Sequence, residues 1–272
     1  FRQHRLEDDM AKDVTRRDVV RGLPLYQQGI IPGSDAVKLS SNENPFGPLP
    51  SVYEAVSRTL SGFNRYPSMG AEEVRAAIAD HFGVDMRQVA VGAGSTEVAG
   101  QLMHARASDG DEIIFPWRSF EAYPILTQVA GATPVPVPLT PDLSHDLDAM
   151  VAAITERTRV IFLCTNNPTG TVLHMDEVKQ FLTQVPEDVV VVMDEAYRHF
   201  NRDDAAVDGF ALLDDYPNVV VLRTFSKAYG LAGLRIGFAI ASTDITDDLR
   251  RVATPFTVTS LAVLPRDVVN AG

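Results

Sequence analysis

The sequence has few of the residues on which disulfide, metal or nucleic-acid chemistry depends. Its single cysteine, Cys164, cannot form a disulfide within the chain. The six histidines are scattered, with no pair four residues apart and no cysteine cluster near them, so we expect no metal site. Lysine and arginine together number 24 against 36 acidic residues, and the formal net charge of −12 would repel a phosphate backbone. We therefore expect no nucleic-acid partner.

Long apolar segments are also missing. No run approaches the roughly 20 apolar residues that span a bilayer, so the sequence predicts no transmembrane helix and no membrane partner. The first ten residues are mostly polar and lack the apolar centre of a secretory signal peptide. Together with the lone cysteine, these features indicate a reducing, cytoplasmic location.

Short runs rich in β-branched residues alternate with segments of helical period. The predicted strands are residues 89–92, 112–115, 133–137, 160–163, 189–193, 219–224 and 236–241. The helical segments include residues 71–82, 96–107, 147–155 and 175–185. Strands that are apolar on both faces and separated by helices are typical of a mostly parallel sheet with helices on both faces. The predicted fold class is therefore α/β, with seven strands.

Ligands of such sheets bind outside the carboxyl ends of the strands, so the residues that follow each run are candidates. Residues 92–96 (Gly-Ala-Gly-Ser-Thr) predict a tight turn into a helix, whose free N–H groups and hydroxyls suit a phosphate. Asp194 follows five apolar residues, where a carboxylate needs a cation or a strong donor. Lys227 follows the sixth run, where partial desolvation would lower its pKa and make the amine a nucleophile.

These three features together match the needs of pyridoxal phosphate, which are a partner for its ring nitrogen, an amine for its aldehyde and an anchor for its phosphate. Taken alone, the glycine turn could be only a capped helix start. A dinucleotide fingerprint would need a third glycine where Glu97 stands. No Gly-x-Ser-x-Gly elbow and no phosphate loop ending in Gly-Lys-Ser/Thr is present.

Several motifs follow one another in a fixed order between about residues 23 and 260. They are Ser41-Asn42-Glu43-Asn44-Pro45, Arg65-Tyr66-Pro67, Asn166-Asn167-Pro168-Thr169-Gly170, Asp194-Glu195-Ala196-Tyr197, Thr224-Phe225-Ser226-Lys227 and Ala232-Gly233-Leu234-Arg235. In this order they resemble the fold type I pyridoxal-phosphate aminotransferases, in the subgroup of histidinol-phosphate and aromatic aminotransferases. Residues 117–123 and 222–230 are most similar to the actinobacterial enzymes described as phenylalanine or aromatic amino acid aminotransferases.

The resemblance implies roles for individual residues. Lys227 would bind the cofactor aldehyde and carry protons, and Asp194 would keep the ring nitrogen protonated. Tyr197 and Asn167 would donate hydrogen bonds to the ring oxygen, while Phe120 would stack on the ring. Of these, Lys227, Asp194 and Tyr197 are the expected catalytic residues.

Further residues are implied at the phosphate and at the substrate. The expected phosphate ligands are Ser95, Thr96, Thr224, Ser226 and Arg235. Tyr66 would reach the phosphate of the neighbouring subunit, which implies a homodimer with shared sites. Tyr26 and Asn42 fall near the family's substrate pocket.

The implied activity is the transfer of an amino group between an aromatic amino acid and a 2-oxo acid. One alternative is the histidinol-phosphate aminotransferase reaction of histidine biosynthesis, and decarboxylase or lyase chemistry on the same fold carries less weight. Another is a truncated chain that binds the cofactor with little or no turnover, because family members continue into a small domain whose arginine binds the substrate carboxylate. We expect an N-terminal arm over residues 1–38, a cofactor-binding large domain over 39–250 and the start of a truncated small domain over 251–272.

Overall fold

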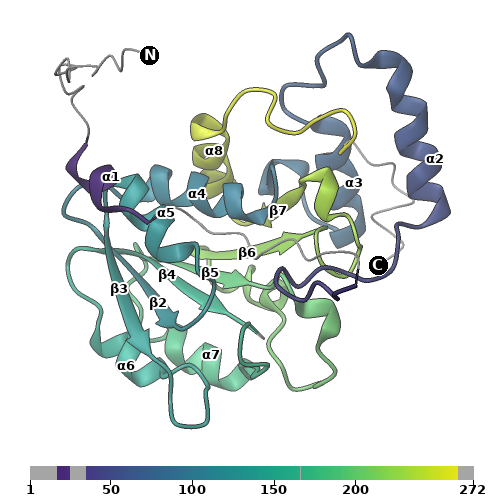
Figure 1. Cartoon of the computed structure of the whole chain (residues 1–272). Helices are drawn as coiled ribbons and strands as arrows, with labels where there is room; N and C mark the ends of the chain where they lie inside the picture. Colours follow the sequence, from purple (N-terminus) through teal and green to yellow (C-terminus); the bar gives the residue numbers. More distant parts are fainter. Residues whose placement is uncertain (1–16, 25–34, 166, 263–272) are drawn as a thin grey trace, which may run out of the picture.

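The computed structural model describes residues 17–24, 35–165 and 167–262 of the chain. One twisted sheet runs through the middle of these residues, with helices packed on both of its sides (Figure 1). The strands lie in the order β1-β7-β6-β5-β4-β2-β3. Their bounds are β1 (Val89–Gly92), β2 (Glu112–Trp117), β3 (Thr133–Pro138), β4 (Thr158–Cys164), β5 (Val190–Asp194), β6 (Val219–Thr224) and β7 (Gly237–Ile240). The predicted α/β class and all seven predicted strands are confirmed.

Strand β7 is the one reversed strand of the sheet. It runs antiparallel to both β1 and β6, whereas the other neighbouring strands pair in parallel. The chain between β6 and β7 contains only the short 3₁₀ helix η5 (Ala232–Leu234), so it has no crossover helix with which to return to the start of β6. A short connection of this kind can join only antiparallel neighbours.

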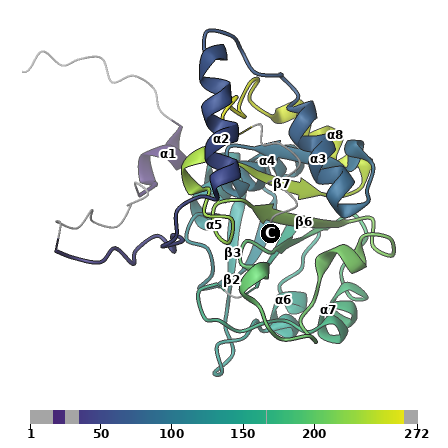
Figure 2. The same cartoon turned by 90° about the vertical axis from the view of Figure 1, so that its right-hand side faces the viewer.

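The helices cover both faces of the sheet. Their bounds are α1 (Asp18–Gly22), α2 (Pro50–Thr59), α3 (Glu72–Phe82), α4 (Ser95–Arg106), α5 (Tyr123–Ala130), α6 (Leu147–Ala152), α7 (Met175–Leu182) and α8 (Thr243–Val252). The remaining 3₁₀ turns are η1 (Leu60–Gly62), η2 (Met86–Gln88), η3 (Arg198–Phe200) and η4 (Gly209–Leu212). In both views α4 and α8 lie on one side of the sheet, and α6 and α7 lie on the other (Figures 1 and 2).

The alternation of side chains along the central strands builds the core. On β4, Phe162 and Cys164 pack into the cluster beneath α4, α5 and α8, whereas Ile161 and Leu163 pack against α6 and α7. Both sets are buried, which explains why this strand reads as an uninterrupted apolar run. A third cluster joins α2 and α3 to β1 and β7.

The helix ends differ from the sequence prediction in places. Helix α7 ends at Leu182 rather than near residue 185, because Pro186 disfavours a helical conformation at Val185. Helix α6 ends at Ala152, earlier than the predicted 155. Helices α1, α2, α5 and α8 have no counterpart in the prediction. The proposed domain boundary at residue 250 falls inside α8, and the division into an arm and two domains stays a prediction.

No helix in the described part of the chain is long and apolar enough to cross a membrane. The same residues contain no group of three or more His, Cys, Asp and Glu side chains placed to hold a metal ion.

Candidate active site

A pocket of about 260 Å³ lies at the carboxyl ends of the central strands. It is lined by Ser41, Glu43, Ser95, Thr96, Phe120, Cys164, Asn167, Asp194, Ala196, Tyr197, Thr224, Ser226, Lys227, Ala232 and Arg235. Most of the residues that the sequence singled out are therefore brought together here from five separate segments. They meet because β4, β5 and β6 are parallel, so that their carboxyl ends lie at one edge of the sheet.

Asp194 is the last residue of β5 and only 5% exposed. Its Oδ2 accepts a hydrogen bond of 2.5 Å from the Tyr123 hydroxyl, and its Oδ1 accepts one of 3.2 Å from the Ala196 N–H. Burial raises the pKa of Asp194, while the hydrogen bonds from Tyr123 and Ala196 oppose that rise. The predicted strong donor is therefore present, as a neutral hydroxyl rather than a cation.

Tyr123 is a site residue that the sequence analysis missed. It is the first residue of α5, its ring is fully buried, and 71 positions separate it from Asp194 in the chain. Its only local signal is a position three residues after Phe120, which does not distinguish it from a core tyrosine. Its contact with Asp194 depends on how α5 packs against the sheet.

Lys227 lies in the loop that follows β6. Its Nζ donates hydrogen bonds to the backbone carbonyls of Ser41 at 3.0 Å and Asn42 at 3.3 Å, and it stands 5.4 Å from the centre of the Tyr197 ring. Desolvation lowers the pKa of this amine; the charge of Glu43 opposes the shift and that of Arg235 adds to it. A lowered pKa for Lys227 is what the sequence predicts, and it increases the fraction of neutral, nucleophilic amine.

The turn before α4 and the loop after β6 form one polar surface. Gly94 has φ +85°, and a Cβ at this position would meet the Arg235 guanidinium, so glycine both permits the turn and leaves room for the arginine. The Arg235 guanidinium donates to the oxygen atoms of Ala93 at 3.1 Å, Ala232 at 3.0 Å and Ser226 at 3.4 Å. Within the described ranges it pairs with no carboxylate, so its positive charge is available to a ligand.

Hydroxyls complete this surface. The Thr224 hydroxyl donates to the Ser226 hydroxyl at 3.0 Å, and the Ser226 N–H donates back to Thr224 at 3.1 Å. Ser95 and Thr96 occupy the first positions of α4, where backbone N–H groups have no partner within the helix. Such a combination of hydroxyls, helix N–H groups and a guanidinium suits a phosphate.

A segment from the N-terminal part of the chain covers the pocket. The Asn42 amide donates to the Tyr197 hydroxyl at 2.9 Å, across 155 positions of sequence. The Asn44 amide donates to the Ala228 carbonyl at 3.0 Å, next to Lys227. Asn42 is thus connected to the site by its hydrogen bond to Tyr197, although it does not line the pocket itself.

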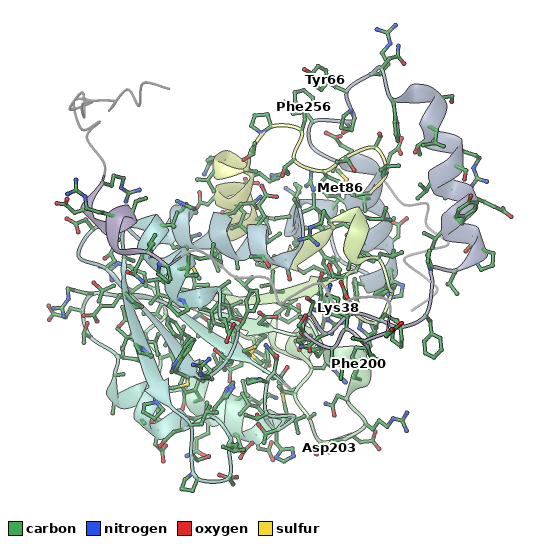
Figure 3. All side chains as sticks on the ribbon, viewed as in Figure 1. Lys38, Tyr66, Met86, Phe200, Asp203 and Phe256 are labelled. Atoms are coloured by element: carbon green, nitrogen blue, oxygen red, sulfur yellow. The ribbon has the colours of Figure 1, made fainter. Side chains whose placement is uncertain are left out.

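One predicted site residue, Tyr66, lies elsewhere. Tyr66 is 82% exposed, packs its ring against Phe256 at 4.7 Å and does not line the pocket. Figure 3 shows Tyr66 and Phe256 next to each other near the top of the view. The predicted reach of Tyr66 into a neighbouring subunit stays a prediction. Tyr26 falls outside the described residues.

A buried ion pair lies directly behind the pocket and was not anticipated. Glu195 and Arg223 are the neighbours of Asp194 and Thr224 on the ends of β5 and β6, with side chains 0% and 9% exposed. Glu195 Oε2 accepts from Arg223 Nη2 at 2.7 Å and from Nε at 2.9 Å, and the guanidinium lies over the Phe210 ring at 4.5 Å. This pair ties together the two strand ends that carry the site.

The charges and donors of the pocket fit pyridoxal phosphate. Asp194 is a buried carboxylate whose partners are neutral, so a cationic ring nitrogen would complete it. Arg235 is a guanidinium without a carboxylate, so an anionic phosphate would complete it. Lys227 supplies an amine with a lowered pKa in the same pocket. One ligand carrying a cationic ring, an aldehyde and a phosphate satisfies all three groups.

Comparison with known proteins points the same way. Residues 34–269 match the family model described as aminotransferase class I and II. Proteins named aromatic amino acid aminotransferase from Cutibacterium acnes and Streptomyces avermitilis are 81% and 55% identical, over 93% and 90% of this chain. The matched regions are 72% and 70% of those two proteins, so the chain spans about seven tenths of their length.

Solved structures share the fold. A histidinol-phosphate aminotransferase from Sinorhizobium meliloti in complex with pyridoxal-5'-phosphate has a TM-score of 0.78 and 28% identity, over 85% of this chain and 63% of that chain. Aspartate aminotransferase from Thermus thermophilus with maleate has a TM-score of 0.75 and 24% identity, over 85% of this chain and 64% of that chain, which is a likeness of fold alone.

Proposed function

Since this chain belongs to the class I and II aminotransferases, we propose that it transfers an amino group between an aromatic amino acid and a 2-oxo acid, with pyridoxal 5'-phosphate as cofactor. The observation that supports this cofactor is that one pocket holds the Lys227 amine, the buried Asp194 carboxylate and the Arg235 guanidinium. The aromatic substrate rests on the 81% identity to the aromatic amino acid aminotransferase of Cutibacterium acnes. We infer the same cytoplasmic location that the sequence predicts.

When bound, the cofactor supplies an aldehyde that takes up the amino group and a protonated ring that withdraws electrons from the substrate Cα. In this proposal Lys227 Nζ would hold the cofactor through its aldehyde and, as a free amine, would take a proton from the substrate Cα and later return it. Its lowered pKa suits both tasks, because the neutral amine is the form that attacks the aldehyde and accepts a proton, and an ammonium of lower pKa returns that proton more readily. Asp194 would hold the proton on the ring nitrogen, and its low exposure would strengthen that charge–charge contact.

Side chains around the ring orient it. Phe120 would pack against the ring and exclude water, and its own ring is held edge-on by Tyr123 at 5.5 Å. The Tyr197 hydroxyl, which accepts from Asn42, and the Asn167 amide would donate to the ring oxygen. Ser95, Thr96, Thr224, Ser226 and Arg235 would bind the phosphate. Asn42, together with Tyr26, would contact the substrate.

We further propose that the active form is a homodimer in which Tyr66 reaches the phosphate of the second copy. The support is a set of exposed apolar side chains in residues 37–69, a segment that includes α2 at the edge of the molecule (Figures 1 and 2). They are Val37, Leu39, Phe46, Tyr53, Tyr66 and Met69, each at least 69% exposed. A monomer rarely leaves so many large apolar groups in water, and a second copy would cover them.

The proposal is tested by titrating the purified chain with pyridoxal phosphate and then assaying transamination. Phenylalanine with 2-oxoglutarate should give a larger kcat/KM than histidinol phosphate with the same acceptor. The opposite order would assign the chain to histidinol-phosphate transamination. Failure of the chain to take up pyridoxal phosphate at micromolar concentration would refute the proposed cofactor. Sedimentation velocity tests the dimer, and a Tyr66→Phe variant tests its predicted contact.

A further inference from the structure

Tyr123 contacts two of the groups that are proposed to hold the cofactor. Its hydroxyl donates to Asp194 Oδ2 at 2.5 Å, and its ring meets the Phe120 ring edge-on, with an interplanar angle of 89° and a centroid distance of 5.5 Å. Asp194 is proposed to pair with the ring nitrogen, and Phe120 to lie on the ring. One side chain therefore connects two groups that come from different segments of the chain.

The surroundings of Tyr123 fix its position. The ring is fully buried, with the Phe162 ring at 4.4 Å and the Phe115 ring at 5.8 Å. It begins helix α5, which packs against β3 and α4. Because the ring is enclosed by β2, β4 and α5, its hydroxyl has little freedom to leave Asp194.

The hydroxyl meets a carboxylate that has few other partners. Asp194 Oδ1 accepts from the Ala196 N–H at 3.2 Å, and Cys164, its neighbour on β4, is a buried thiol whose pKa is raised by burial. Of these two hydrogen bonds to the carboxylate, the one from the Tyr123 hydroxyl is thus the shorter. A hydrogen bond to an ionised acceptor is about twice as strong as one between neutral groups, so this contact favours the charged carboxylate and restricts its rotation.

We propose that Tyr123 is a positioning residue that holds Asp194 ionised and correctly oriented toward the cofactor ring nitrogen, while its ring fixes Phe120 on the ring face. The inference rests on the proposed function, since it concerns the same pocket. It assigns Tyr123 no proton transfer and no contact with substrate. Its consequence is that the strength of cofactor binding depends on a hydroxyl that lies outside the pocket lining.

The test is a double-mutant cycle on cofactor affinity. Tyr123→Phe keeps the ring and removes only the hydroxyl, and Asp194→Asn removes the charge to which that hydroxyl donates. The Kd for pyridoxal phosphate is measured by absorbance titration for the unaltered chain, each single variant and the double variant. We expect Tyr123→Phe to weaken binding about tenfold in the Asp194 background, the size expected for a hydrogen bond to a charged group. In the Asp194→Asn background the same change should alter the Kd less than about twofold.

Tyr216→Phe is the matched control. Tyr216 precedes β6 at the opposite end of that strand from the pocket and packs in the cluster against α6 and α7, so loss of its hydroxyl should leave the Kd unchanged. Thermal unfolding of the cofactor-free variants checks that each is folded. If Tyr123→Phe does not fold, the ¹³C resonance of the Asp194 carboxyl in the unaltered chain decides: an ionised carboxyl at neutral pH supports the inference, and a protonated one overturns it.

The outcomes separate the two proposals. If the unaltered chain binds no pyridoxal phosphate, the proposed function fails. If it binds the cofactor and Tyr123→Phe has the same Kd, or if the loss is equally large with Asp194→Asn, Tyr123 has only a packing role and this inference alone is wrong.

Discussion

Replacing Arg223 by methionine should destabilise the folded chain by about 3 to 5 kcal/mol, the cost of leaving one member of a buried ion pair without its partner. Glu195 has a side chain that is 0% exposed, and Arg223 makes two hydrogen bonds to its Oε2, at 2.7 and 2.9 Å. Methionine fills a similar volume beside the stacked rings of Phe82 and Phe210 but supplies no charge. The Gly209 N–H, which donates to Glu195 at 2.6 Å, would remain as a neutral partner.

The loss of stability caused by Arg223→Met should increase with pH. Burial raises the pKa of Glu195, and the charge of Arg223 opposes that rise. Without Arg223 the pKa in the folded state moves further above the unfolded value of about 4.3. Below that value Glu195 is protonated in both states and the variant loses little, whereas the loss grows as the pH rises from there and levels off above the raised pKa of the folded variant. The difference from the unaltered chain should therefore be larger at pH 7 than at pH 4.

Urea denaturation followed by circular dichroism at the two pH values measures this difference. Arg251→Met is the control, because Arg251 is 72% exposed and its pair with Asp248 is a surface contact worth less than about 1 kcal/mol. The double change Glu195→Gln with Arg223→Met should recover part of the stability, since no buried charge is left. A loss at pH 7 no greater than that of the control would refute the argument.

Three further changes test the site directly. Lys227→Ala should abolish covalent capture of pyridoxal phosphate, so that borohydride reduction leaves no modified peptide; capture through another lysine would contradict the assignment. Asp194→Asn should reduce kcat by more than about tenfold while shifting the melting temperature little, because the amide keeps the shape but not the charge, and near-normal turnover would count against it. Gly94→Ala should weaken cofactor binding and lower stability by about 1 kcal/mol or more, since φ is +85° and the new Cβ would meet Arg235; an unchanged Kd would show that the turn tolerates a side chain.

The sequence was sufficient for the strands of the sheet and for the edge of the sheet at which the pocket lies. Each buried strand is a short apolar run, and its period is fixed by the backbone, so the runs could be recognised one at a time. Parallel strands bring their carboxyl ends to one edge whatever their neighbours are, which is why Asp194 and Lys227 could be expected together from their positions after two runs. The roles of these residues stay predictions.

Only the tertiary structure decided which side chains contact and support the predicted site residues. The donor to Asp194 is Tyr123, 71 positions away on a helix that the sequence analysis did not predict, and the partner of Tyr197 is Asn42, 155 positions away. Glu195 and Arg223 read as ordinary polar residues until two strands place them side by side in a dry interior. Local patterns fix the period of an element and, less closely, its length. Contacts between elements depend on how helices and loops pack over the sheet, and a single stretch of sequence does not encode that packing.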